Sequence, residues 1–429
     1  MFFMKRELLN YLLIAGISLT MVVPNIRSLD QMIPEFIYYG ILTTISLGYI
    51  SFVGIGLDQT KLLVSHPLTI AVLIFFSLSI IGLFFAVNQS ESIIALSKYF
   101  IIIVSVYVLS ILMKNLSLQA FLILIISLLF LETSKVIYEF TKIYNFQSPL
   151  IRSRNYAGFA ANVNVMAFSI LFKLPFLVSI LNKQKLSSFK NILLILLLSG
   201  SVFSIMISFS RGAILASILS MILYICFFIF FKYGDIKHWY KRIGVILLTI
   251  IITSATYSFL FQNAKASNIS NRITSFDLVD TTSSINFRMT YYKNAIQAMF
   301  DQPLLGYGIG NWKVVSIKYA KDFIQGYEVP YHAHNDFLQI GAETGIIGFL
   351  SYLFIFLFLL YKLIWSILSN TVNQNKKEFY LAFFLCVLIY SLDSSINFPR
   401  ARPVNIINLT LVIGFLISKN FKLESHENI

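Results

Sequence analysis

The chain has 429 residues, of which 57% are hydrophobic and only 12% are charged, whereas a soluble protein of this size usually carries about 25% charged residues. This composition excludes a disordered chain, a disulfide-rich scaffold and an ordinary cytosolic enzyme. The net charge of +14 is not gathered into a basic block, and no zinc-finger or RNA-binding signature accompanies it. Lysines that orient a membrane protein explain the charge more simply, and we expect no nucleic acid partner.

Apolar segments near 20 residues recur along the whole chain, and each is long enough to cross roughly 30 Å of hydrocarbon as a helix. They predict an all-α polytopic membrane protein with about 12 transmembrane helices, folded as a single membrane domain over residues 1–429. The first segment follows Lys5 and Arg6 without a small-residue cleavage site, which predicts a retained helix. The expected spans are 8–24, 34–53, 67–87, 93–113, 118–138, 156–181, 190–209, 212–231, 243–261, 336–361, 377–396 and 404–418.

The distribution of lysine and arginine predicts the orientation. With the N-terminus inside, sixteen of these cations lie on inner segments and nine on the short outer ones, so we expect both termini in the cytoplasm. Eight of the ten arginines nevertheless fall outside. Arginine is favoured where a phosphate or carboxylate is gripped by two parallel hydrogen bonds, although snorkelling at the interface is the simpler alternative.

The seventh and eighth expected spans are separated only by Ser210, Arg211 and Gly212. The chain must turn there, which places Arg211 at the outer membrane surface. An arginine at that depth is costly unless it has a partner or faces a wet cavity. It either binds an anion or marks a hairpin tip that touches lipid headgroups.

Residues 262–335 form the only long polar stretch, and we interpret them as a periplasmic loop that carries amphipathic helices. The pattern predicts a helix over about 287–300 with Asn286 as its N-cap. Arg288 falls on the apolar side of the first turn, where its charge opposes the helix dipole. A bound anion would relieve this conflict, as would a nearby carboxylate. The glycines at 306, 308 and 310 predict a tight turn after the helix.

The tenth span opens with the sequence HAHNDFLQIGAETGIIG at 332–348. Asp336, Gln339 and Glu343 form a polar stripe that should face the interior of the bundle. His334 lies at the outer end of this stripe, where an imidazole can accept a proton near neutral pH. His332 and His334 are poorly spaced for a metal, so we expect none. Further polar residues near the outer ends of spans are Glu132, Glu139, Arg152, Arg154, Asp393, Arg400 and Arg402, which could simply pair with one another.

Arginines and one imidazole at a membrane surface suit a lipid-anchored diphosphate. The guanidinium groups would neutralise the leaving group and the imidazole would take a proton from an attacking hydroxyl. The sequence contains neither Asp-x-Asp nor a P-loop, which argues against nucleotide donors and predicts no cofactor.

Four segments carry a resemblance to a known family: FSRGA at 209–213, QPLLGYGIGNW at 302–312, HNDFLQIGAETGIIG at 334–348 and, more loosely, RNYAGFAANVNVMA at 154–167. They resemble the O-antigen ligase family, which is related to O-antigen polymerases and O-oligosaccharyltransferases. The resemblance implies inverting, metal-independent transfer of a glycan from undecaprenyl diphosphate to an acceptor hydroxyl, on the periplasmic side of a bacterial inner membrane. It implies that Arg211 and Arg288 bind the diphosphate and that His334 is the base. It also implies that Glu343, Asn164 and Asn335 support the polar interior.

Three functions stay open at this point. Ligation to lipid A core is the leading interpretation, and polymerisation of O-antigen or another surface polysaccharide is the alternative, with a growing glycan as acceptor. A transporter or flippase of lipid-linked oligosaccharide is less favoured because the two halves of the chain share no evident pattern. A scaffold for polysaccharide export is weaker still. The sequence determines neither the sugar nor the oligomeric state.

Overall fold

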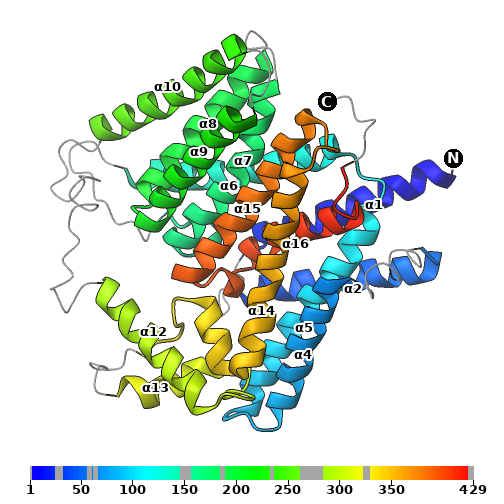
Figure 1. Ribbon diagram of the computed structural model, residues 1–429, viewed down its shortest axis with the longest axis vertical. Helices are drawn as coiled ribbons and strands as arrows, with labels where there is room; N and C mark the ends of the chain where they lie inside the picture. The colour runs from blue at the N-terminus through cyan, green and yellow to red at the C-terminus, as the bar shows by residue number, and fades with distance from the viewer. Residues whose placement is uncertain are drawn as a thin grey trace. The chain divides into compact units, whose positions relative to one another are not determined.

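A computed structural model describes residues 2–24, 32–55, 60, 66–144, 156–183, 189–231, 236–260, 284–321 and 329–423 (Figure 1). All regular structure in these ranges is helical, with fourteen α-helices and three short 3-10 helices. The fold is therefore all-α, as predicted. Arg27, Arg152 and Arg154 lie outside the described residues.

The helices follow one another along the chain with short connections. The α-helices are α1 (Phe2–Ser18), α2 (Ile33–Val53), α4 (Pro67–Leu83), α5 (Gln89–Leu112), α6 (Leu118–Ile143), α7 (Val163–Lys183), α8 (Phe189–Ile207), α9 (Arg211–Phe231), α10 (Ile236–Leu260), α12 (Ser284–Asp301), α13 (Trp312–Ala320), α14 (Asp336–Leu368), α15 (Gln374–Ile396) and α16 (Pro403–Ser418). The 3-10 helices are η1 (Leu19–Val22), η3 (Gly158–Ala160) and η4 (Pro399–Ala401).

Each of the twelve expected spans lies on its own helix. Within the described ranges, nine helices are long and apolar enough to cross a membrane, while α4 and α16 are apolar but shorter. At 1.5 Å per residue, the 16 residues of α16 give a helix that is shorter than the hydrocarbon core. The multi-pass membrane architecture is confirmed, and crossing by α1, α4 and α16 stays a prediction.

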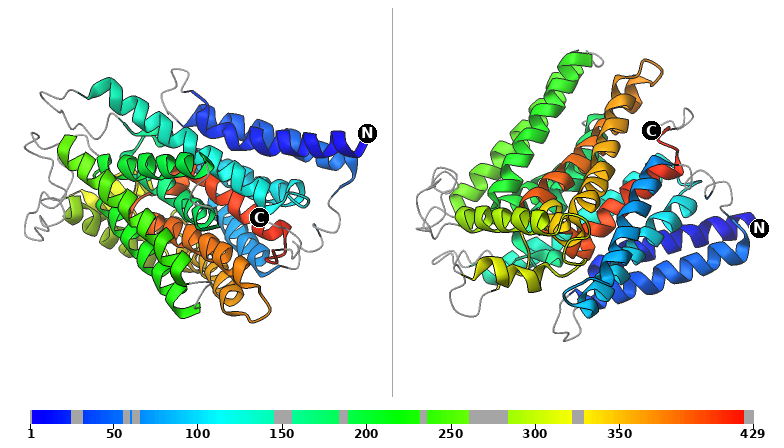
Figure 2. Two further views of the ribbon diagram at one scale, coloured as in Figure 1. Left: turned by 90° about the horizontal axis from the view of Figure 1, so that it is seen from above. Right: turned by 60° about the horizontal axis from the view of Figure 1, so that its bottom comes forward.

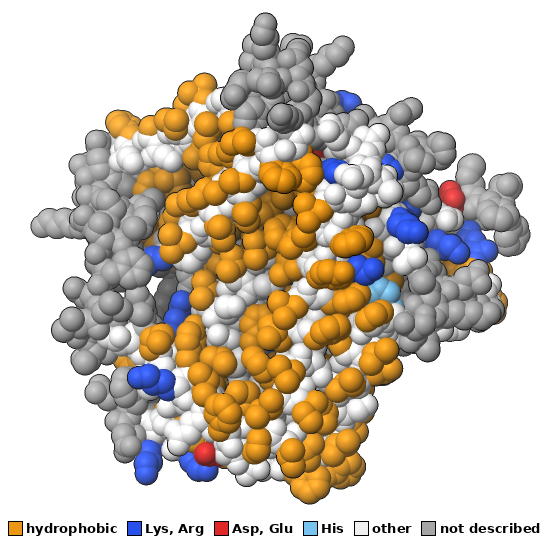
Figure 3. Space-filling model, viewed as in Figure 1, with side chains coloured by type: hydrophobic (Ala, Val, Ile, Leu, Met, Phe, Trp, Pro, Cys, Tyr) orange, Lys and Arg blue, Asp and Glu red, His pale blue; other side chains and the backbone are white. Residues whose placement is uncertain are grey.

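Apolar side chains remain on the outside of the molecule, as a lipid-facing surface requires. Figure 3 shows them spread over broad areas of one face. Phe52, Phe189 and Phe230 are 93%, 72% and 75% exposed. In water such areas would favour aggregation, whereas in a bilayer they lie against acyl chains.

Internal contacts divide the chain into two compact units, and each is described here by itself. Unit 1 comprises residues 1–116, 277–361 and 394–422, and unit 2 comprises residues 117–276, 362–393 and 423–429.

Unit 1 is built around α1, α2, α5 and α16. The first two of these helices lie side by side (Figure 2). Tyr39 of α2 is fully buried and donates a hydrogen bond to Thr410 of α16 at 3.3 Å. Gly414 lets α16 approach α5 closely, because a Cβ there would lie 2.8 Å from the Cβ of Leu109. Small residues and hydroxyls thus join these helices.

Unit 2 packs α6, α7, α8, α9, α10 and most of α15. Glu132 and Lys173, which interrupt two apolar segments in the sequence, form a buried ion pair with 2.8 Å between Nζ and Oε1. Lys173 also donates to the carbonyl of Ser169 at 2.8 Å, and the Ser169 hydroxyl donates to Glu132 at 3.0 Å. Because the two charges satisfy one another, both helices can stay inside the apolar interior.

Candidate functional site

A break in α14 organises the outer part of unit 1. We expected one continuous span over 336–361, with Gly345 as part of a small-residue packing stripe. The helix is instead broken at Gly345, whose φ of 76° and ψ of −175° are accessible essentially only to glycine. Gly341 does pack closely, because a Cβ there would lie 2.5 Å from Sδ of Met299 on α12.

The turn at 302–312 fills this break. In an unbroken helix the amide of Ile346 would donate to the carbonyl of Ala342. Here the Ile346 amide donates to the carbonyl of Pro303 at 2.8 Å, and the Ala342 carbonyl accepts from the amide of Tyr307 at 3.1 Å. Both groups released by the break are therefore satisfied, which explains how irregular backbone is tolerated at this depth.

The predicted glycine turn is confirmed. Gly306, Gly308 and Gly310 all have positive φ, at 62°, 91° and 80°. A Cβ on Gly306 would collide with the backbone of Glu343 and Thr344. The turn is also held from its other side, because Asn311 accepts from the amide of Asn88 at 2.7 Å and donates to Ser92 at 2.8 Å.

The predicted polar stripe on α14 is buried. Asp336, Gln339 and Glu343 are 0%, 5% and 1% exposed. Gln339 donates to Glu343 at 3.0 Å, and Glu343 also accepts from the amide of Trp312 at 3.2 Å. Glu343 thus joins α14 to the start of α13, in agreement with the supporting role expected for it.

Arg400 of η4 neutralises this stripe. Its Nε donates to Asp336 at 2.8 Å, and one terminal nitrogen donates to the hydroxyl of Tyr99 at 2.6 Å. Its other terminal nitrogen lies 3.7 Å from Glu343 Oε2. The sequence offered Asp393 or Glu132 as equally plausible partners, and the tertiary structure selects Asp336 and Glu343.

The segment that carries the two histidines is held at three points. The carbonyl of Pro330 accepts from Ser316 at 3.1 Å, the amide of Ala333 donates to Gln339 at 3.1 Å, and the carbonyl of His334 accepts from Tyr292 at 3.0 Å. His334 itself has a φ of 55°, which is uncommon for a residue other than glycine. This fixed backbone defines the direction of its imidazole.

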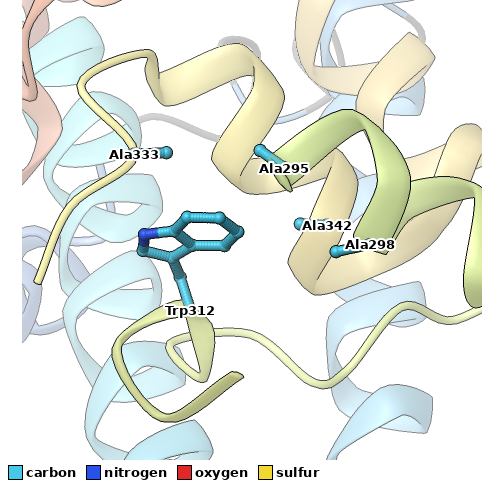
Figure 4. Packing of buried hydrophobic residues seen from close by; sticks show 5 residues of the cluster. All are labelled: Ala295, Ala298, Trp312, Ala333 and Ala342. Atoms are coloured by element: carbon cyan, nitrogen blue, oxygen red, sulfur yellow. The ribbon is translucent and has the colours of Figure 1, made fainter. Parts of the chain in front are cut away.

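Trp312 supports the same segment from within. Its indole packs among Ala295 and Ala298 of α12, Ala342 of α14 and Ala333 (Figure 4). All five residues are at most 1% exposed. The four alanines leave room for one large ring, so Trp312 sets the spacing between α12, α14 and the chain next to His334.

The His334 imidazole is half-buried among aromatic rings. It stacks on Tyr291 with 6.2 Å between centroids and meets the edge of Phe398 at 5.1 Å. Its Nδ1 is buried and has no hydrogen-bond partner within the described part of the chain. Burial, and secondly the charge of Arg288, lower the pKa of His334 to about 4. The imidazole is therefore neutral at physiological pH.

Arg288 lies close to this imidazole, as its effect on the pKa of His334 shows. A terminal nitrogen of Arg288 donates to Asn397 at 3.4 Å. The helix that carries Arg288 is correctly predicted, but it begins at Ser284. Asn286 therefore lies inside the first turn and is not the N-cap, and its carbonyl accepts from the hydroxyl of Thr290 at 3.0 Å.

Arg211 belongs to unit 2, where the expected turn between α8 and α9 is confirmed. Phe209 has a φ of 52°, and the hydroxyl of Ser210 accepts from the amide of Ala213 at 3.4 Å, which caps α9. Arg211 is the first residue of that helix. Along the following turns, Ile214 and Ser217 line an apolar pocket of about 400 Å³ enclosed by α7, α8, α9 and α10.

Two asparagines expected to support the polar interior lie at helix starts. Asn335 precedes α14, and its side chain accepts from the amide of Leu338 at 3.0 Å, as an N-cap does. Asn164 lies in the first turn of α7 in unit 2, where its amide donates to the side chain of Asn162 at 3.0 Å.

Sequence reasoning gave no site role to several residues that surround the histidines. His332 stacks on Phe398 with 4.2 Å between centroids, and Arg402 lies over the same ring at 5.3 Å. Burial and the nearby charges of Arg400 and Arg402 hold the pKa of His332 well below its usual range. The excess of arginine on outer segments was the available signal, but it did not show which arginines converge.

Comparison with known proteins then assigns the outer half of this architecture. Residues 193–353 match the O-antigen ligase family model. The match confirms the resemblance over this segment, and it includes Arg211, Arg288, His334 and Glu343 but not Asn164 or Arg400.

Two curated relatives are similar to part of the chain. A Rickettsia conorii protein whose name describes it as a candidate polysaccharide ligase is 32% identical over 151 residues, which are 34% of this chain and 35% of that protein. A Rickettsia felis protein of the same description is 29% identical over 153 residues, which are 35% of each chain. The chain thus spans about a third of the length of these relatives. The O-antigen ligase match and the relatives' names agree on the class of reaction to be considered.

Proposed function

We propose that this chain is a membrane glycosyltransferase that moves a glycan from undecaprenyl diphosphate to an acceptor hydroxyl. The leading form is O-antigen ligation to lipid A core, without a metal and with inversion at the sugar. The proposed site faces the periplasm, and the membrane is the bacterial inner membrane. The observation that carries the proposal is the pairing, within one compact unit, of Arg288 with a half-buried neutral imidazole at His334.

The proposed chemistry uses these two groups in different roles. Arg288 hydrogen-bonds the diphosphate, and each such charged hydrogen bond contributes about 1.5–3 kcal/mol. The acceptor oxygen forms a bond to the anomeric carbon while the bond from that carbon to the diphosphate oxygen breaks. The electron pair leaves with the diphosphate, and the acceptor proton passes to His334.

A pKa near 4 suits this role only if it rises when the donor binds. The anionic diphosphate would offset the charge of Arg288, which is the second cause of the depressed pKa. The imidazole would then approach the basicity that efficient proton transfer requires. Donor binding and activation of the base are coupled in this proposal.

The role expected for Arg211 stays a prediction. Arg211 begins α9, and the pocket that follows along this helix is lined almost entirely by apolar side chains. A cation followed by an apolar pocket suits a lipid that carries a diphosphate, and the transfer assay below tests this through Arg211→Gln.

Transfer from purified undecaprenyl-diphosphate glycan to purified lipid A core tests the proposal. We expect His334→Gln and Arg288→Gln each to lower the transfer rate by about 100-fold or more. Lys293→Gln is the matched control, because Lys293 is an exposed cation on the same helix and should keep the rate within about twofold. Wild-type rates in both site variants would contradict the proposal.

Electrophoresis of surface glycans separates the two forms of the reaction. Loss of every capped chain in a deletion strain indicates a ligase, whereas single-repeat caps indicate a polymerase. Both forms share the donor and the proposed base, and only the acceptor differs.

The pH dependence of the rate gives an independent test of His334. Because the pKa of His334 is lowered to about 4 in the free protein, the acid limb of kcat/KM should fall well below pH 6.5, the ordinary value for histidine. Removing the charge in Arg288→Gln should move this limb toward higher pH, though not fully to 6.5, since burial is the larger cause. A limb at 6.5 in the wild type, unmoved by Arg288→Gln, would exclude His334 as the base.

A further inference from the structure

Tyr331 is an exposed aromatic residue three positions before His334. Its side chain is 56% exposed, yet it is braced. Lys313 of α13 donates to the Tyr331 hydroxyl at 3.2 Å and lies 5.0 Å from the centre of its ring. Lys313 is in turn held by Glu91 of α5 at 2.5 Å. An exposed ring with its orientation fixed in this way loses little conformational freedom on binding a ligand.

A continuous series of rings connects Tyr331 with His334. The edge of Tyr331 meets His332 at 5.0 Å, and His332 stacks on Phe398 at 4.2 Å. Phe398 then meets His334 at 5.1 Å. Arg402 lies over the same Phe398 ring, so the series is flanked by hydrogen-bond donors. The outer end of the series is an open aromatic face, and its inner end is the proposed base.

We infer that Tyr331 is a stacking platform for a sugar ring of the acceptor glycan, an inference that rests on the proposed function. A pyranose has an apolar C–H face and polar edges. Tyrosine offers the matching apolar face, and Lys313 and Arg402 offer donors to the hydroxyls at the edge. The acceptor would then reach His334 by way of Phe398, whereas the diphosphate is held at Arg288 on α12.

An aromatic belt at the membrane surface is the competing explanation for an exposed tyrosine. A belt residue needs only an amphipathic ring at the right depth. It does not require an ion-paired lysine that fixes the hydroxyl, nor an unbroken series of rings that ends at a histidine of the proposed site. These two features favour sugar binding.

Steady-state transfer with separate titration of each substrate tests the inference. The acceptor probe is purified lipid A carrying its core oligosaccharide, and the donor probe is undecaprenyl-diphosphate glycan. In Tyr331→Ala we expect the KM for the acceptor to rise about three- to tenfold, as loss of one aromatic contact implies. The KM for the donor and kcat should stay within about twofold. Tyr331→Phe should keep most of the affinity, because the ring face remains.

Tyr361→Ala is the matched control, since Tyr361 is 58% exposed in the same unit and should leave both KM values unchanged. Binding of the core oligosaccharide in the absence of donor, measured by calorimetry, should weaken by the same factor as the KM in Tyr331→Ala. An unchanged acceptor KM, or a change confined to the donor KM, overturns the inference. Absence of transfer by the wild-type protein would instead refute the proposed function.

Discussion

Replacing Arg400 with methionine is expected to lower the free energy of unfolding by about 3–5 kcal/mol, the usual cost of removing one partner from a buried ion pair. Asp336 and Glu343 are 0% and 1% exposed, and both face this guanidinium at 2.8 and 3.7 Å. Without it, two carboxylates would remain in an apolar interior. Thermal unfolding in detergent, compared between purified variants, measures the effect.

Two further variants separate charge from shape at this position. Arg400→Lys keeps the charge but lacks the planar group that contacts Asp336, Glu343 and Tyr99 together, so it should recover only part of the loss. Asp336→Asn in the Arg400→Met background removes one orphaned charge and should also recover part. If Arg400→Met unfolds at the wild-type temperature, the carboxylates must be neutralised in another way.

Gly345→Ala is expected to cost about 3 kcal/mol or more, because it combines two penalties. The backbone at this position is strained for any residue with a side chain, which costs about 1–3 kcal/mol. The new Cβ would also lie 2.5 Å from the carbonyl oxygen of Pro303, so the turn at 302–312 would have to move. We expect a lower unfolding temperature together with loss of transfer activity, since the same turn is joined to α14 next to Glu343.

The chain supplies matched controls for each penalty. Gly54 has a φ of 66° but open space around it, so Gly54→Ala reports backbone strain alone. Gly48 lies inside α2 with nothing within 4 Å, and Gly48→Ala should be neutral or slightly stabilising, as alanine favours helix. Equal losses in Gly54→Ala and Gly345→Ala would show that contact with Pro303 contributes nothing.

The break in α14 illustrates where sequence reasoning stops. The spacing of Asp336, Gln339 and Glu343 is helical, and the apolar run continues through residue 361, so one straight span was the natural prediction. The break depends on a turn about 40 residues earlier that supplies a donor at Tyr307 and an acceptor at Pro303. A local pattern carries no information about such a distant partner, although positive-φ glycines on both segments are consistent with it.

The partners of the charged residues show the same limit. The sequence identified Glu132, Lys173, Asp336, Glu343 and Arg400 as ionisable groups near or inside apolar segments. It did not indicate that Lys173 pairs with Glu132 or that Arg400 pairs with Asp336 and Glu343. Each pair joins segments at least 41 residues apart, and several pairings satisfied the same charges.

The sequence by itself determined the helical membrane class, the positions of the helices, the turn at Arg211 and the approximate position of α12, because hydrophobic length and periodicity are local properties. Only the tertiary structure decided that α14 is broken, that Arg400 neutralises its buried stripe, and that Arg288 lies beside His334 within a series of aromatic rings. Those features depend on which distant groups satisfy one another where water is absent, and that selection is made by packing.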